Sequence, residues 1–242
     1  MHNSFGLIII GDELLLGTRE DGHLSQFRKM LGRRGHQLQR CWFLPDESRT
    51  LVEHFRFSMS EPLPVFVCGG IGATPDDLTR NSAAVAAGVP LQPHPEAVAL
   101  IEERFGEAAY PTRIQMAVLP SGAEIIPNPI NRIPGFCINK HYFLPGFPEM
   151  AWPMAEWVVE QFYPSTGEGL RECSVQVIDT PESRLVEIME HLNEQFPEVK
   201  PYSLPRLGNN SLVELGLRGR GDLTKAFSAL QEALRKRQIP FR

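Results

Sequence analysis

Three strand-like segments, each followed by an acidic or glycine-rich loop and then a helix-like segment, constrain the fold of this chain most. They are FGLIII at 5–10, QLQRCWFL at 37–44 and PVFVC at 64–68. Strands that alternate with amphipathic helices predict a parallel sheet covered by helices on both faces. We therefore expect an α/β fold, a three-layer α/β/α sandwich with a mostly parallel sheet, over residues 1–163.

Later segments of this first domain give less regular signals. Residues 95–105 and 111–119 favour helix, whereas EIIPNPINRIPGF at 124–136 is too rich in proline for regular structure. HYFLPGFPEM at 141–150 predicts a strand, a proline–glycine turn and the start of a helix.

The pattern changes after PSTGEG at 164–169, which we interpret as a linker because it is small, polar and turn-forming. Residues 170–242 then predict a separate small α+β domain. The elements expected there are two strands, at 174–178 and 211–217, and two amphipathic helices, at 183–196 and 222–237.

Composition excludes several classes of protein. The 242-residue chain has a net charge of -5, which argues against a nucleic-acid partner. It contains no apolar run long enough to span a membrane and no signal-peptide pattern at its start. Its four cysteines are scattered, without the short spacings of a zinc site or a disulfide framework. We expect a cytoplasmic protein without nucleic-acid or membrane partners.

The loop GGIGATPDD after the third strand carries the strongest chemical signal. Gly69, Gly70 and Gly72 allow backbone N–H groups to converge on a phosphate, although the spacing matches neither a Walker A loop nor a dinucleotide fingerprint. The alternative is a tight turn in which Asp76 or Asp77 caps the next helix.

Acids follow all three strands: Asp12 and Glu13, Asp46, and the pair Asp76 and Asp77. Parallel strands bring such loops to one edge of the sheet. Carboxylates repel phosphate, and Mg²⁺ or another divalent cation bridging the two would resolve that conflict. Helix capping at each loop is the alternative. His23, in contrast, is expected to be a polar surface residue.

Four motifs in order, GDELLLG, PDES, GGIGATPDDLT and LPGFPEM, resemble the molybdopterin-binding MoaB/Mog family, and most of all its CinA-type branch. The resemblance covers residues 4–160, and the segment from 170 is similar to the small second domain of CinA-type proteins. It does not extend to the amide-hydrolysing domain of longer CinA-type proteins, so we do not expect that activity here.

This resemblance implies relatives that handle phosphorylated pterins or nucleotides. One branch adenylylates molybdopterin with ATP and magnesium, and the CinA-type branch is associated with hydrolysis of the ADP-ribose pyrophosphate bond. By position, the resemblance makes Asp46 and Asp77 the catalytic and metal-binding acids. The residues expected to bind phosphate or nucleotide are Gly11, Asp12, Glu13, Gly69, Gly70, Gly72, Thr74, Asp76, Thr79, Pro145 and Gly146.

Several positions depart from the family pattern. Ala73 stands where proline is common, Ile130 and Asn131 replace more flexible residues, and EDGH at 20–23 replaces a DTN-like sequence. LPGFPEM is also one residue shorter than usual. These changes are expected to alter the walls that select a substrate rather than the phosphate and metal apparatus.

We therefore expect a metal-dependent nucleotide-pyrophosphate hydrolase of CinA type, acting on an ADP-ribose-like substrate. The alternatives are a non-catalytic molybdopterin or nucleotide binding protein, adenylyl transfer to a pterin, and a structural subunit acting through the small domain. The expected partner is a phosphorylated small molecule, and the apolar faces also allow a homo-oligomer.

Overall fold

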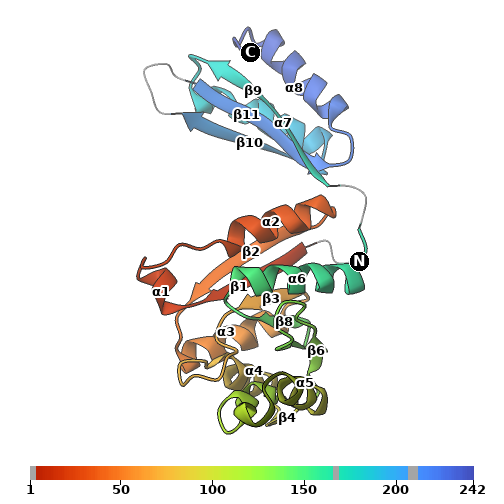
Figure 1. Cartoon of the computed structure of the whole chain (residues 1–242). Coiled ribbons are helices and arrows are strands. Elements are labelled where there is room, and N and C mark those ends of the chain that lie inside the picture. The colour runs from red at the N-terminus through yellow and green to blue at the C-terminus, as the bar shows by residue number, and fades with distance from the viewer. Residues whose placement is uncertain (1–3, 166–168, 207–211) are drawn as a thin grey trace. The chain divides into compact units, whose positions relative to one another are not determined.

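The computed structural model describes residues 4–165, 169–206 and 212–242, and it divides the chain into two compact units (Figure 1). The first unit is Met1–Ser165 and the second is Thr166–Arg242. Half of the linker predicted at 164–169, residues 166–168, lies outside the described residues.

The first unit is built around a six-stranded sheet in the order β2-β1-β3-β8-β7-β6. The first four of these strands run parallel, and β7 and β6 are antiparallel additions at one edge. The strands are β1 (Ser4–Ile10), β2 (Gln37–Leu44), β3 (Val65–Cys68), β6 (Glu124–Ile126), β7 (Gly135–Ile138) and β8 (His141–Leu144).

The side chains of β1 show how this sheet supports two helical layers. Phe5, Leu7 and Ile9 point to one face and pack in one hydrophobic cluster, whereas Ile8 and Ile10 join a separate cluster on the opposite face. Successive strand side chains point to opposite faces, so an unbroken apolar run is what a strand buried on both sides requires.

Helices cover both faces of this sheet, which confirms the predicted three-layer α/β/α sandwich (Figure 1). One layer holds α2 and α6, and the other holds α3, α4 and α5. No helix in the described ranges is both long enough and apolar enough to cross a membrane. The helices are α2 (His23–Arg33), α3 (Ser48–Ser60), α4 (Thr79–Ala87), α5 (Pro95–Phe105) and α6 (Pro148–Phe162).

Two segments of the first unit differ from expectation. Residues 111–119, expected to be helical, form a short 3-10 helix, η2 (Arg113–Ala117), and then β5 (Val118–Pro120), which pairs with β4 (Leu91–Pro93). The proline-rich segment 124–136 contains β6 and the start of β7, because its prolines fall in the connection between these two short strands. A further 3-10 helix, η1 (Gly106–Ala109), follows α5.

The second unit has its own antiparallel sheet, in the order β10-β11-β9, with a core of its own shared with two helices. This confirms the predicted α+β class. The strand β10 was not expected, because VKPYSLPR contains two prolines and no clear apolar alternation. The elements are β9 (Leu170–Ile178), η3 (Glu182–Arg184), α7 (Val186–Gln195), β10 (Val199–Arg206), β11 (Leu212–Arg220) and α8 (Thr224–Lys236).

Candidate functional site

A cavity of about 510 Å³ opens where the four parallel strands of the first unit end. Its walls come from the loops after β1, β2, β3 and β8, together with residues of the 116–133 region. In open α/β sheets ligands bind at the carboxyl ends of the strands, and this volume is in the range of small-molecule sites.

Two glycines bring the β3 loop close to its neighbours. Gly69 has φ 116°, and a Cβ there would lie 2.5 Å from the carbonyl oxygen of Ile10. Gly70 has φ 66°, and a Cβ there would collide with Oγ1 of Thr79. That hydroxyl donates to the Gly69 carbonyl at 2.9 Å. Thr79 is fully buried and does not line the cavity. It was expected to bind phosphate or nucleotide, but in the structure its hydroxyl supports the β3 loop.

Asp77 folds back into the same loop. One of its carboxylate oxygens accepts a hydrogen bond from the Gly72 N–H at 2.9 Å, and the other accepts from the Thr74 N–H at 2.8 Å and from the Thr74 hydroxyl. The carboxylate thus occupies the anion-binding turn that the glycine pattern predicts. It does not cap α4, whose N-terminus has no side-chain cap. The Asp77 carboxylate therefore serves as the anion that the N–H groups of its own loop bind.

Asp46 and Asp12 form a reciprocal pair between the β2 and β1 loops. The Asp12 N–H donates to Oδ2 of Asp46 at 3.1 Å, and the Asp46 N–H donates to Oδ1 of Asp12 at 3.2 Å. Burial raises the pKa of Asp46, and the nearby carboxylates of Asp12, Glu13 and Asp76 raise it further, whereas the Asp12 amide opposes this. Asp46 lines the cavity, and Asp12 does not. Neither acid caps α3.

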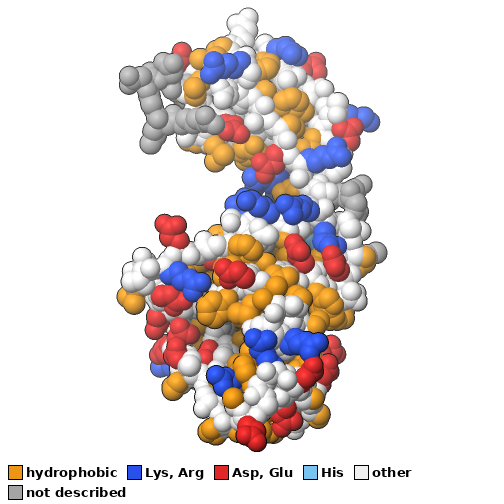
Figure 2. Space-filling view, in the orientation of Figure 1, with side chains coloured by type: hydrophobic (Ala, Val, Ile, Leu, Met, Phe, Trp, Pro, Cys, Tyr) orange, Lys and Arg blue, Asp and Glu red, His pale blue; other side chains and the backbone are white. Residues whose placement is uncertain are grey.

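The charges around the cavity are strongly unbalanced. Figure 2 shows acidic side chains gathered on the side of the first unit where α1 (Asp12–Leu15) lies. Among the lining residues, the one Lys or Arg is Arg19, which lies 3.9 Å from a carboxylate oxygen of Glu13. In the described part of the chain no three His, Cys, Asp or Glu side chains are grouped to hold a metal. The six lining acids are Glu13, Glu20, Asp21, Asp46, Asp76 and Asp77.

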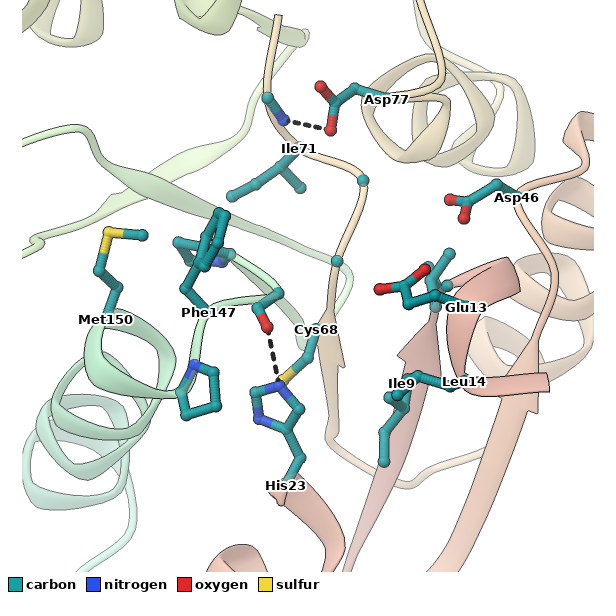
Figure 3. Close-up of a pocket in the computed structure, with 18 of the residues that line it drawn as sticks. Ile9, Glu13, Leu14, His23, Asp46, Cys68, Ile71, Asp77, Phe147 and Met150 are labelled. Atoms are coloured by element: carbon teal, nitrogen blue, oxygen red, sulfur yellow. Dashed lines mark hydrogen bonds between the residues drawn. The ribbon is translucent and has the colours of Figure 1, made fainter. Parts of the chain in front are cut away.

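The opposite end of the cavity is apolar. In Figure 3, Ile71, Phe147 and Met150 lie on the side away from Glu13 and Asp46. Phe147 is 56% exposed, and its ring also contacts the guanidinium of Arg19, 5.9 Å from the ring centroid. The remaining expected residues, Gly11, Pro145 and Gly146, also line the cavity. One cavity therefore joins a polar end to an apolar end.

His23 is a lining residue that the sequence interpretation missed. It is 4% exposed, and its Nε2 lies 3.2 Å from the carbonyl oxygen of Gly146, which links the start of α2 to the β8 loop (Figure 3). Burial lowers the pKa of His23. The expectation of a surface histidine was wrong because the first residue of α2 points toward the cavity. Asp21 accepts from the N–H groups of His23 and Leu24 at the start of α2, but nothing in the sequence marks the burial of the His23 ring.

Arg80 is a second residue that the sequence did not single out. Its guanidinium donates to the carbonyl of Gly72 at 2.6 Å and to the carbonyls of Gln115 and Val118 at 2.5 and 3.1 Å. The last two residues flank Met116, which lines the cavity. Arg80 therefore fixes the glycine loop to the η2–β5 segment, in which Met116 lines the cavity.

Comparison with known proteins gives relatives over most of the chain. A protein from Pyrobaculum calidifontis is 30% identical over 83% of this chain and 80% of its own length. A CinA-like protein from Geobacter sp. is 31% identical over 76% of this chain, and the match spans only 46% of that longer relative. The crystal structure of the CinA protein of unknown function from Thermoplasma acidophilum matches with a TM-score of 0.59 and 26% identity, over 66% of this chain and 97% of that one.

The family model that matches is described as a probable molybdopterin binding domain, and it covers residues 6–164. That range contains almost all of the six-stranded sheet and every residue of the cavity. The chain therefore belongs to the molybdopterin-binding MoaB/Mog-type family, as a CinA-like member.

Proposed function

We propose that this chain is a magnesium-dependent hydrolase of nucleotide pyrophosphates, with an ADP-ribose-like substrate. The charge balance of the cavity is the observation that carries the proposal: six lining carboxylates face one guanidinium, that of Arg19. A phosphate entering such a site needs a divalent cation, because uncompensated like charges in a partly buried site repel strongly.

The cation would be held by Asp46. Its carboxylate lies at the cavity wall among other acids that disfavour its ionised form, and a cation there would relieve that repulsion. Mg²⁺ bound with phosphates commonly uses only one or two carboxylates, so a preformed group of three is not required. Both oxygens of Asp77 are engaged within the glycine loop, so its contact with a cation stays a prediction and the proposal does not depend on it.

When bound, the magnesium ion would neutralise phosphate charge and polarise the phosphoryl group. The chain's own residues would position the substrate. The guanidinium of Arg19, which already lies near Glu13 and the Phe147 ring, would supply positive charge to a phosphate oxygen, and the apolar end of the cavity would accept a ring. Gly69 and Gly70 keep the β3 loop close to the sheet, so the backbone can approach the ligand.

Binding of a nucleotide or pterin without turnover is the second candidate. One observation favours it: both carboxylate oxygens of Asp77, the second acid expected to be catalytic, are engaged in hydrogen bonds within the glycine loop. Adenylyl transfer to a pterin ranks third, since no specific feature of the cavity selects it.

The test is direct. Purified chain with Mg²⁺ is given ADP-ribose, and release of AMP is followed chromatographically for wild type, Asp46→Asn and Asp179→Asn, the last being a matched substitution in the second unit. We expect release by wild type and Asp179→Asn and none by Asp46→Asn. Equal release by all three variants would contradict the proposed role of Asp46. No release by wild type, despite binding of AMP, would favour the ligand-binding function.

A further inference from the structure

The polar end and the apolar end of the cavity suit two chemically different parts of one ligand. Glu13 and Asp46 stand at one end, and Ile71 of the glycine loop, Phe147 and Met150 stand at the other (Figure 3). A phosphorylated compound with a flat ring matches this division, because ligand sites combine apolar walls with a few polar groups that fix orientation.

Asn128 supplies a polar group in the wall of this cavity. Its side chain is 4% exposed, and its Oδ1 accepts hydrogen bonds from the N–H groups of Ile130 at 3.0 Å and Asn131 at 3.4 Å. Two N–H donors require an oxygen acceptor, so they fix which atom of the amide is oxygen and which is nitrogen.

The other end of that amide has no partner. Nδ2 of Asn128 is buried, and no described residue accepts a hydrogen bond from it. A buried donor without an acceptor is costly, and such groups in native structures call for an explanation, often a missing water or ligand. The neighbouring Asn131 differs, since its Nδ2 donates to the sulfur of Met150. Asn128 is thus the amide of this loop that retains an unused donor.

We propose that Asn128 is a specificity-determining residue, whose side-chain N–H donates to an acceptor atom of a nitrogen heterocycle bound at the apolar end of the cavity. Purines and pterins both present ring nitrogens of this kind, so the shared chemistry is a flat ring with an acceptor edge. This inference rests on the proposed function in one respect, that the ligand also carries a phosphate. It does not require turnover.

The variant Asn128→Asp separates ring recognition from loop structure. The carboxylate keeps an oxygen for the N–H groups of Ile130 and Asn131, but it replaces the donor with a second acceptor. Asn193→Asp, at an exposed position of α7 in the second unit, makes the same change in charge away from the cavity. Both variants can be compared with wild type by titration calorimetry in millimolar Mg²⁺, which the proposed function requires for phosphate binding.

Three probes are used: AMP, a pterin monophosphate, and ribose 5-phosphate, which has the sugar and phosphate of AMP without the ring. We expect wild type to bind at least one ring compound more tightly than ribose 5-phosphate, and that compound identifies the ring. Asn128→Asp should weaken it about ten- to a hundredfold, as expected for a lost buried hydrogen bond. Ribose 5-phosphate should lose less affinity than the ring compound, because the added charge acts on both ligands and the lost bond acts on the ring compound alone. Every affinity of Asn193→Asp should stay within about twofold of wild type, since that residue lies outside the cavity.

Other outcomes overturn the inference in ways that can be told apart. Unchanged affinity of Asn128→Asp for the ring compound would show that Nδ2 of Asn128 donates to water and makes no hydrogen bond to the ligand. An equal loss for ribose 5-phosphate would show a general disturbance of the cavity. If wild type binds ribose 5-phosphate as tightly as the ring compounds, the ring adds nothing to affinity. The proposed role of Asn128 is then wrong, whereas phosphate binding in the cavity is supported. If it binds none of the three, the proposed function falls with the inference.

Discussion

At the scale of single residues, Asp46 has a carboxylate whose ionised form is disfavoured by its surroundings. Burial and the neighbouring acids raise its pKa above the ordinary value near 3.8. The folded state therefore binds a proton more readily than the unfolded chain, and stability falls as pH rises from the unfolded pKa through the raised folded pKa. Above that window the full penalty remains.

Because the ionised Asp46 carboxylate destabilises the folded state, removal of its charge in Asp46→Asn has a predictable effect on stability. The amide can still accept from the Asp12 N–H but carries no charge, so the midpoint of thermal unfolding at pH 7 should stay the same or rise. Millimolar Mg²⁺ should raise the midpoint of wild type and leave that of the variant unchanged.

Turnover by wild type should also fall on acidification at a higher pH than an unperturbed aspartate would give. A lowered midpoint in the variant would show that the ionised carboxylate is stabilising and would refute this account.

Gly69 gives a second prediction at this scale. Gly69→Ala must place a Cβ 2.5 Å from a backbone oxygen at φ 116°, so we expect the free energy of unfolding to fall by about 2–4 kcal/mol. Gly32→Ala is the control, because Gly32 lies in α2 where an added Cβ would have nothing within 4 Å, and alanine there should be neutral or stabilise by about 0.5–1 kcal/mol. Urea titration of both variants checks the pair. Equal effects would mean that the close approach at Gly69 has no energetic consequence.

At the scale of elements, Arg80 joins the start of α4 to the glycine loop and to the η2–β5 segment. Arg80→Met leaves the carbonyls of Gly72, Gln115 and Val118 without this donor, so the free energy of unfolding should fall by about 3 kcal/mol. Affinity for AMP should fall as well, because two cavity walls lose their common anchor. Arg80→Lys should recover part of both losses. Arg49→Met, which breaks an exposed pair with Glu53, should change neither, and urea titration with calorimetry measures all three variants.

The elements also show what a sequence of this kind predicts and why. β1 and β3 could be placed because an apolar run followed by a polar loop leaves few alternatives to a buried strand. The meeting of their loops at one cavity follows from parallel order. The direction in which each acid points could not be predicted. Asp77 accepts from N–H groups of its own loop and Asp21 from those at the start of α2, and both depend on backbone geometry that no spacing encodes. His23 was misplaced for a related reason, since burial of one polar side chain depends on the β8 loop 123 residues away.

At the scale of the whole molecule, each of the two units has a sheet and a hydrophobic core of its own. No strand pairing in the described residues joins the six-stranded sheet to the three-stranded one. Every residue that lines the cavity lies before residue 151, within the first unit. A domain with its own core is able to fold independently.

We therefore predict that residues 1–165 alone fold and retain the site. Circular dichroism should show one cooperative thermal transition, and calorimetry should give an affinity for AMP within about twofold of the full chain, because the cavity walls are complete without the second unit. The fragment carrying Asn128→Asp should lose ring affinity to the same extent as the full-length variant. A fragment that folds but binds AMP much more weakly would show that the second unit contributes to the ligand site. A fragment that fails to unfold cooperatively would show that the first core depends on the rest of the chain.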